Sequence, residues 1–144
     1  ANEKFESISI GDDFDLLLHY YDYLAGMTYY YSYNTIKMSD LYYSENNNEE
    51  YWQEMVDYAN LLLSTSDSLI EITGDNYNFT HDTTFNNDDI KWVRAQTYIR
   101  INELDAAEVE ASSISFLQEC LEDNSVIYCL NNCQDGSCSN NINP

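Results

Sequence analysis

The sequence predicts an all-α fold, an antiparallel four-helix arrangement of two helical hairpins followed by an irregular, disulfide-pinned C-terminal tail. Apolar residues recur with the 3.6-residue period of amphipathic helices in four separate segments. Polar runs rich in Asn and Asp separate these segments, as expected of loops. All four cysteines lie within the last 25 of the 144 residues. A chain of this length is expected to form one domain.

The first helix is expected to begin at Asp12, after an extended arm over residues 1–11. Carboxylates at its start suit the positive end of the helix dipole. Two apolar stripes run side by side as far as Tyr31, so this helix should be covered on more than one side. Residues 34–47 show a mixed pattern, in which only 39–43 favour a short helix.

The second helix has the clearest pattern in the chain and follows a run of three asparagines. Asn48 is expected to cap its free amides, with Glu49 and Glu50 in the first turn. Apolar residues then keep to one face over residues 52–70. Gly74 is placed to end the helix in the left-handed conformation.

The second hairpin is expected after a polar loop over residues 75–87. A third helix follows this loop, and a break is expected at 102–104. The break is favoured because Asp105 and Glu108 form the D-x-x-E pattern of a capping box. The fourth helix is then expected to continue to Leu121.

The last residues predict an irregular tail over 122–144, with a short strand at 126–128. The tail should bury little apolar surface and should be held by its cysteines. We therefore expect a helical domain over residues 1–121, including the arm over 1–11, with the tail packed on the same domain.

The second hairpin also carries small and aromatic residues at a characteristic spacing within residues 91–114, about a sixth of the chain. These residues are Ala95, Tyr98, Ala107, Ala111 and Ile114. In this spacing the segment resembles a tetratricopeptide-type helical hairpin. Trp92 is one place out of register, and the Gly and the terminal Pro of that repeat are absent. The resemblance implies tetratricopeptide-like packing; an up-down bundle is the alternative, because any tight helical pair needs small residues at its crossing.

The cysteines indicate two disulfides and an oxidising compartment. Cys120, Cys129, Cys133 and Cys138 admit three pairings, and the sequence does not choose among them. The alternatives are free thiols or a zinc site, although the spacing lacks the paired C-x2-C of zinc ribbons. Asn78 begins an N-F-T glycosylation sequon. The chain starts without Met, as a processed secreted protein would. We expect a secreted, extracellular protein.

The net charge of −21, from 26 Asp and Glu against five Lys and Arg, limits the partners. Such a charge repels nucleic acid and anionic membrane surfaces, so we exclude both. Only Lys91, Arg94 and Arg100 cluster, and we expect them to pair with neighbouring carboxylates. An acidic proteome from a high-salt habitat would also explain the charge.

Catalytic motifs do not occur in the sequence, and it contains only two histidines. We therefore expect neither an enzyme nor a resident cofactor. Calcium is a possible ligand, because acidic residues of one loop offer the oxygen atoms that it prefers. The candidate calcium ligands are Asp75, Asp82, Asp88 and Asp89. Tyr77 and Phe79 occupy two positions where an EF-hand loop would need ligands.

Tyrosines are the remaining signal, because nine of the fourteen lie within the 24 residues 20–43. They are too many for the inward face of one helix, so we expect a share of them at a subunit interface. A ligand cleft is the alternative. The expected interface residues are Tyr20, Tyr23, Tyr29, Tyr30, Tyr31, Tyr33, Tyr42 and Tyr43.

Together these observations predict a secreted, non-catalytic structural or interaction protein. We expect a subunit of an extracellular assembly that self-associates through its Tyr-rich helical surface. One alternative is a secreted binding module for a saccharide, a peptide or a small ligand. Another is a calcium-responsive acidic matrix protein.

Overall fold

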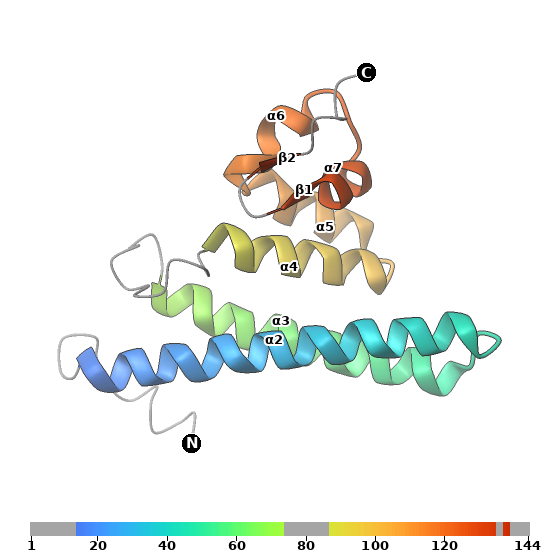
Figure 1. The fold of residues 1–144 in the computed structure, drawn as a ribbon, viewed down its shortest axis with the longest axis horizontal. Coiled ribbons are helices and arrows are strands. Elements are labelled where there is room, and N and C mark those ends of the chain that lie inside the picture. Colours follow the sequence, from blue (N-terminus) through green and yellow to red (C-terminus); the bar gives the residue numbers. More distant parts are fainter. Residues whose placement is uncertain (1–13, 74–86, 135–136, 139–144) are drawn as a thin grey trace.

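The computed structural model describes residues 14–73, 87–134 and 137–138. In this part of the chain the fold is all-α, with antiparallel helical pairs and a disulfide-linked C-terminal end, as predicted. Two long helices form the base, and a shorter helical pair and the C-terminal elements lie on one side of it (Figure 1).

The first described helix, α2 (Phe14–Ser44), is longer than the sequence predicts. It runs for 31 residues without a break, about 46 Å at 1.5 Å per residue. The prediction that only residues 39–43 of the segment 34–47 favour a helix is therefore wrong. The buried face of α2 continues through Thr35 and Met38. The Thr35 Oγ1 donates to the Tyr31 carbonyl at 2.7 Å. This bond satisfies the hydroxyl inside the helix, so a polar residue can be buried there.

The second helix, α3 (Glu49–Thr73), confirms the prediction at its start. The Glu50 amide donates to the Asn48 Oδ1 at 2.8 Å, which is the expected cap. Asn46 and Asn47 adopt positive φ angles of 59° and 58°, a conformation that Asn tolerates better than most residues. The asparagine run therefore both turns the chain back on itself and starts the next helix. Gly74 lies outside the described residues.

The second helical pair consists of α4 (Asn87–Arg100) and α5 (Leu104–Ser112). Asn102, with φ 63°, makes the tight turn between them. The expected capping box at Asp105 is wrong, because Glu103, two residues earlier, occupies the N-cap of α5 without a side-chain bond. Small residues do lie at the crossing. Ala95, Ala107 and Ala111 are fully buried.

The expected helix to Leu121 is interrupted. After α5 the backbone becomes extended at Ile114, and the chain then forms a 3-10 turn, η2 (Ser115–Leu117), and the short helix α6 (Gln118–Leu121). The Gln118 Nε2 donates to the carbonyls of Ile114 at 2.8 Å and Ser112 at 2.9 Å. These bonds satisfy carbonyls near the break.

The strand expected at residues 126–128 is also wrong, because α7 (Val126–Asn132) occupies this segment. The Ser125 Oγ caps this helix by accepting from the Tyr128 amide at 3.1 Å. Two short strands, β1 (Cys133–Gln134) and β2 (Ser137–Cys138), then pair antiparallel.

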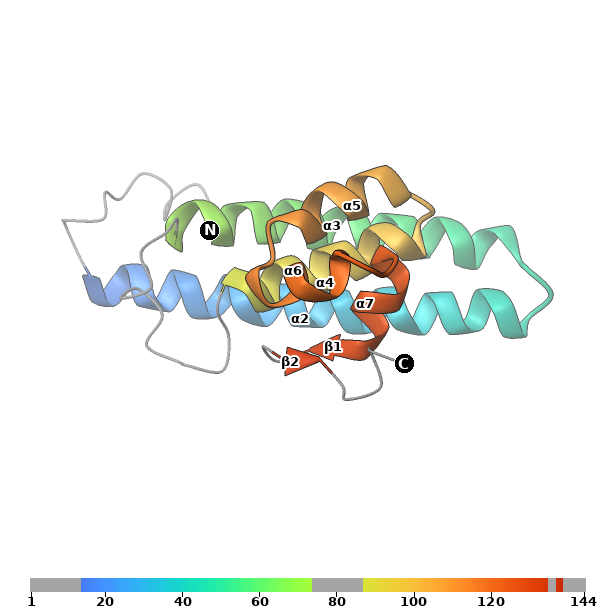
Figure 2. The same cartoon turned by 90° about the horizontal axis from the view of Figure 1, so that it is seen from above.

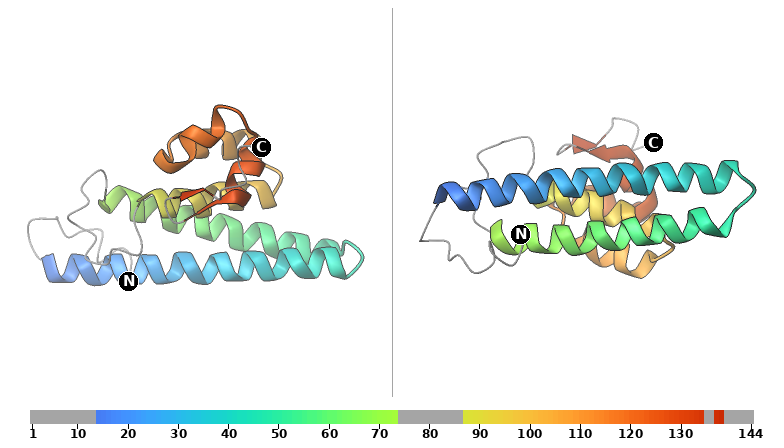
Figure 3. Two further views of the ribbon diagram at one scale, coloured as in Figure 1. Left: turned by 45° about the horizontal axis from the view of Figure 1, so that its top comes forward. Right: turned by 90° about the horizontal axis from the view of Figure 1, so that it is seen from below.

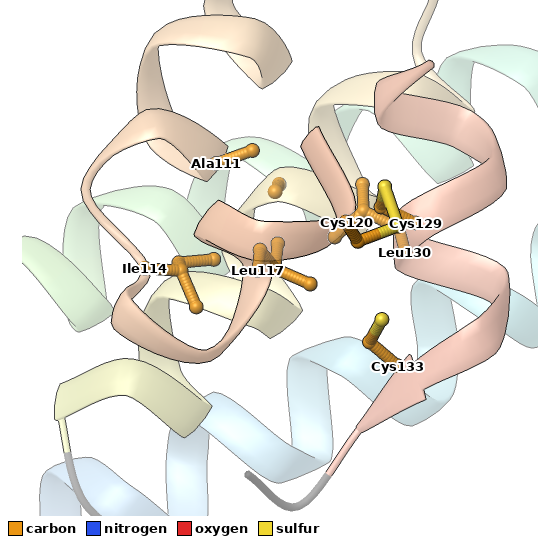
Figure 4. Packing of buried hydrophobic residues seen from close by; sticks show 8 residues of the cluster. Ala111, Ile114, Leu117, Cys120, Cys129, Leu130 and Cys133 are labelled. Carbon is orange, nitrogen blue, oxygen red and sulfur yellow. A yellow bond between two sulfur atoms is a disulfide. The ribbon is translucent and has the colours of Figure 1, made fainter. Parts of the chain in front are cut away.

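Two apolar clusters organise this arrangement. The first joins α2, α3 and α4 and consists of Tyr20, Tyr21, Leu24, Leu69 and Ile90. The second joins α4 with the C-terminal elements and consists of Ala95, Ala111, Ile114, Leu117, Cys120, Cys129, Leu130 and Cys133 (Figure 4). The tail therefore buries more apolar surface than the sequence suggests. The helix α4 contributes to both clusters and lies over the α2–α3 pair (Figure 2).

None of the described helices combines the length and the apolar character needed to cross a membrane.

Candidate interaction surface

The tyrosines of α2 divide between the core and the surface. Those at the surface are about half exposed or more and, with one isoleucine, form a continuous group on one side of the helix. We call this group the tyrosine face: Tyr23 (46% exposed), Tyr29 (50%), Tyr30 (54%), Tyr33 (66%) and Ile36 (39%). Their spacing of three, four and seven residues places them on neighbouring turns. Tyr43 is exposed further along the same helix.

Tyr20 does not belong to this surface, although the sequence led us to expect it there. It is only 3% exposed and belongs to the first apolar cluster with Tyr21 and Leu24. Tyr31 and Tyr42 are half-buried and lie between the core and the surface. Five of the eight expected interface tyrosines are therefore exposed on α2.

The half-buried tyrosines connect the exposed rings to α3. The Tyr30 ring lies edge-on to the Tyr31 ring at 5.6 Å, and the Tyr31 ring lies 6.4 Å from that of Tyr58 on α3. Near the end of the hairpin, the Tyr42 ring lies 5.1 Å from both the Tyr43 and the Trp52 rings. Such contacts restrict the motion of the exposed rings, which lowers the entropy lost when a partner binds them.

Gly26 leaves an opening within the tyrosine face. Tyr23 and Tyr29 precede and follow it by three residues, and Tyr30 follows it by four, so all three are its neighbours on the helix surface. A Cβ atom added at Gly26 would meet no atom within 4 Å beyond its chain neighbours and the nearby backbone of its own helix. A glycine inside a helix is destabilising by about 0.5–1 kcal/mol relative to alanine. Gly26 therefore leaves open space on the helix surface between these tyrosines.

The tyrosine face also differs from the rest of the molecule in charge. The 17 residues from 23 to 39 contain no Asp or Glu, in a chain that contains 26 of them. Lys37 is the only charged residue in this stretch. Asp22 and Asp40 lie at its two ends and are both exposed.

Among the described elements, none covers this side of α2. The α4–α5 pair and the C-terminal elements lie on one side of the α2–α3 pair, and the view from the other side shows α2 and α3 in front of them (Figure 3). The exposure of the tyrosine face agrees with this arrangement.

The cysteines form the disulfides Cys120–Cys129 and Cys133–Cys138, with S–S distances of 2.07 and 1.96 Å. This result selects one of the three pairings and leaves no thiolate for a zinc ion. Three of the four cysteines are buried in the second apolar cluster to within 3% exposure, and Cys138 packs against it. The Trp92 Nε1 donates to the Cys133 carbonyl at 2.8 Å, which ties the disulfide-linked end to α4.

The candidate calcium ligands and the sequon are only partly described. Asp75, Asp82 and Asn78 lie outside the described residues. The Asp88 Oδ2 accepts a hydrogen bond from the Ser115 Oγ and so joins the start of α4 to η2. Asp89 is half-buried beside it. Within residues 14–73, 87–134 and 137–138, no group of three His, Cys, Asp or Glu side chains is placed to hold a metal ion.

Arg94 is paired with carboxylates, as expected, but its central role was not predicted. This guanidinium on α4 is 7% exposed and forms ion pairs with Asp67 on α3 at 2.9 Å and Glu110 on α5 at 3.0 Å. It also donates to the Leu63 carbonyl at 2.9 Å and the Ser66 Oγ at 2.6 Å. One side chain therefore joins three helices.

Arg100 lies at the end of the same helix. Burial lowers the pKa of its guanidinium, and the negative charge of Asp40 on α2 acts in the opposite direction. The Arg100 guanidinium also donates to the Oε1 of Gln96 on the same helix at 3.4 Å, whereas Arg94 joins α4 to α3 and α5.

Comparison with known proteins gives no match: no protein-family model, no curated protein and no solved structure corresponds to this chain. Function must therefore be argued from the surface itself.

Proposed function

We propose that this chain is a secreted, non-catalytic interaction protein, a subunit of an extracellular assembly that packs through its tyrosine face. The observation that carries this proposal is the exposed group of Tyr23, Tyr29, Tyr30 and Tyr33 on α2. Contiguous exposed aromatic side chains are typical of binding surfaces, because each ring combines apolar area with a hydroxyl group.

The disulfides support the extracellular part of the proposal. Disulfides persist in oxidising compartments and are rare where thiols are kept reduced. Here both bonds are integrated into a buried cluster. The C-terminal elements therefore depend on an oxidising environment for their packing.

The shape of the surface supports a protein partner. The tyrosine face lies on the outer side of a long helix, and its rings are spread over consecutive turns. An outer helix face can pack against another helix, whereas small ligands generally need a concave site that encloses them. Its rings and hydroxyls also suit a structural role better than acid–base chemistry.

Sedimentation of the chain, with its disulfides intact, tests this proposal. We expect the wild-type chain to associate at about 100 µM, since modest interfaces have micromolar affinities. Replacing Tyr30→Ser and Tyr33→Ser together should weaken association at least tenfold, because aromatic anchors dominate such interfaces. Val109→Ser is the matched control, because Val109 is an exposed apolar residue (73%) on α5, away from the face.

The same experiment separates the alternatives. A wild-type chain that remains monomeric with and without calcium would overturn the assembly. Association that appears only with calcium would favour the acidic matrix protein. A chain that does not associate but binds soluble oligosaccharides through Tyr30 and Tyr33 would favour the binding module.

A further inference from the structure

We infer that the partner of the tyrosine face is a second copy of this chain, with the two α2 helices antiparallel and a two-fold axis between Tyr29 and Tyr30. This inference rests on the proposed function and specifies its partner and its geometry. In a two-fold pair, residues at equal distances on either side of the axis face each other across the interface.

Steric fit supports this geometry. With the axis between Tyr29 and Tyr30, Tyr33 of one copy faces Gly26 of the other. Tyr33 is the most exposed residue of the tyrosine face, at 66%. Gly26 has open space where a side chain would be. The most exposed ring, that of Tyr33, therefore packs into the open space at Gly26 of the other copy, and the two-fold symmetry produces this contact twice.

The charges at the two ends of the tyrosine face also favour this geometry. The same axis places Lys37 of one copy opposite Asp22 of the other, and Asp40 opposite His19. All four side chains are exposed. A parallel, in-register pair would instead place Lys37, Asp22 and Asp40 each opposite the same residue of the other copy. Like charges facing each other are unfavourable, so the antiparallel pair is selected.

The overall negative charge of the chain opposes this pair only weakly. Two chains of −21 repel each other at long range. The contacting surfaces consist mainly of residues 23–39, and this stretch contains no Asp or Glu. At an ionic strength of about 0.15 M the screening length is about 8 Å, so carboxylates elsewhere on the chain oppose the contact only weakly.

The size of the surface sets the expected affinity. A tyrosine side chain can bury about 200 Å², so four half-exposed tyrosines and Ile36 offer about 500 Å² per copy. This area lies at the lower limit for a specific complex, and a micromolar Kd is expected.

Substitutions at Gly26 test the steric argument without harming the fold. Gly26→Ala and Gly26→Gln both favour the helix, so each should raise the Tm of the monomer by about 3 °C. Gly26→Gln fills the opening and should weaken association at least tenfold, with Gly26→Ala between it and the wild type. Ser64→Gln is the matched control, because Ser64 is an exposed residue of α3. Association unchanged in Gly26→Gln would overturn the inference.

A charge exchange tests the antiparallel register. Lys37→Asp alone and Asp22→Lys alone should each weaken association about tenfold, because each places like charges together. The double variant Asp22→Lys with Lys37→Asp should restore it to within about twofold, since the pair is only reversed. If the single variants associate normally while Tyr30→Ser with Tyr33→Ser does not, the register is wrong and the proposed function stands. If the wild-type chain is monomeric, both fail.

Discussion

The α2–α3 hairpin and the C-terminal region from α5 to β2 are stabilised in different ways. The hairpin consists of helices of 31 and 25 residues. The C-terminal region consists of elements of two to nine residues. Helices shorter than about 12 residues are marginal on their own, so the C-terminal region needs further stabilisation.

The contacts reflect this difference. Along the hairpin, the buried Thr28 and Thr35 donate to carbonyls of their own helix. Even these polar residues can therefore be buried, and the hairpin is stabilised by regular packing along a long interface. The C-terminal region instead uses two disulfides and side-chain bonds such as Gln96 to the Leu130 carbonyl at 3.2 Å. The hairpin is therefore stabilised by the length of its helices, and the C-terminal region by disulfides between short elements.

The two tryptophans allow the regions to be followed separately. Trp52 lies on α3 and Trp92 on α4 beside the second apolar cluster, and the chain contains no others. Single-tryptophan variants, Trp52→Phe or Trp92→Phe, therefore report unfolding of one region at a time.

The largest effect is expected for Arg94→Ala, because Arg94 joins α4 to α3 of the hairpin and to α5 of the C-terminal region. The substitution leaves Glu110 half-buried without its ion pair and the Ser66 hydroxyl without its donor. Breaking a buried ion pair destabilises by about 3–5 kcal/mol. Urea unfolding should show this loss with both tryptophan reporters.

The double variant Arg94→Met with Glu110→Leu is the control for Arg94→Ala. Replacing both partners with apolar groups is less harmful than removing one, so part of the loss should be recovered. A loss below about 1 kcal/mol in Arg94→Ala would mean that α4 is held by apolar packing alone.

An intermediate effect is expected for the double variant Cys120→Ala with Cys129→Ala. The bond closes a loop with a sequence separation of nine, so its removal should cost about 2–3 kcal/mol. Because the bond lies in the C-terminal cluster, the Trp92 transition should move to lower urea more than the Trp52 transition. Equal shifts would show that the two regions unfold as one unit.

The smallest effect is expected for Asn48→Ala at the start of α3. It removes the cap bond to the Glu50 amide and should cost about 1 kcal/mol. Asn48→Asp keeps the cap and should retain nearly all of the stability. Thermal unfolding followed through Trp52 measures both variants. If Asn48→Ala melts at the same temperature as the wild type, tertiary packing and not the cap determines where α3 begins.

The predictable parts of the fold are those with strong local signals. The start of α3 follows from Asn48. The break before α5 lies where the sequence predicts it, but its cause differs, because Asn102 makes the turn and Asp105 does not cap the helix. The continuation of α2 could not be predicted, because buried Thr35 resembles a surface residue until its bond to Tyr31 is known. The helix α7 was mistaken for a strand because Val126 and its neighbours favour strands, whereas the cap and the disulfide hold them in a helix.

The candidate surface could be predicted only in part. The number of tyrosines showed that some must be exposed, and five of the eight are. Which ones are exposed depends on where α3 and α4 pack on α2, and this is a tertiary property. Tyr20 therefore differs from Tyr23 although both lie on the same helix. Gly26 could have been found from the sequence, since tyrosines occupy the positions three and four residues from it.

The shared position of α4 has a consequence for the order in which the chain assembles. The helices α2 and α3 follow each other directly in the chain, so their hairpin can form before α4 and the C-terminal elements pack on it. Ile90 on α4 packs against Tyr21 and Leu69 in the first cluster, and these residues remain open to solvent until α4 arrives. During synthesis the hairpin is thus exposed on two sides, and the described elements of the chain later close one of them. Prompt docking of α4, secured by oxidation of the cysteines, should therefore protect the newly made chain from aggregation.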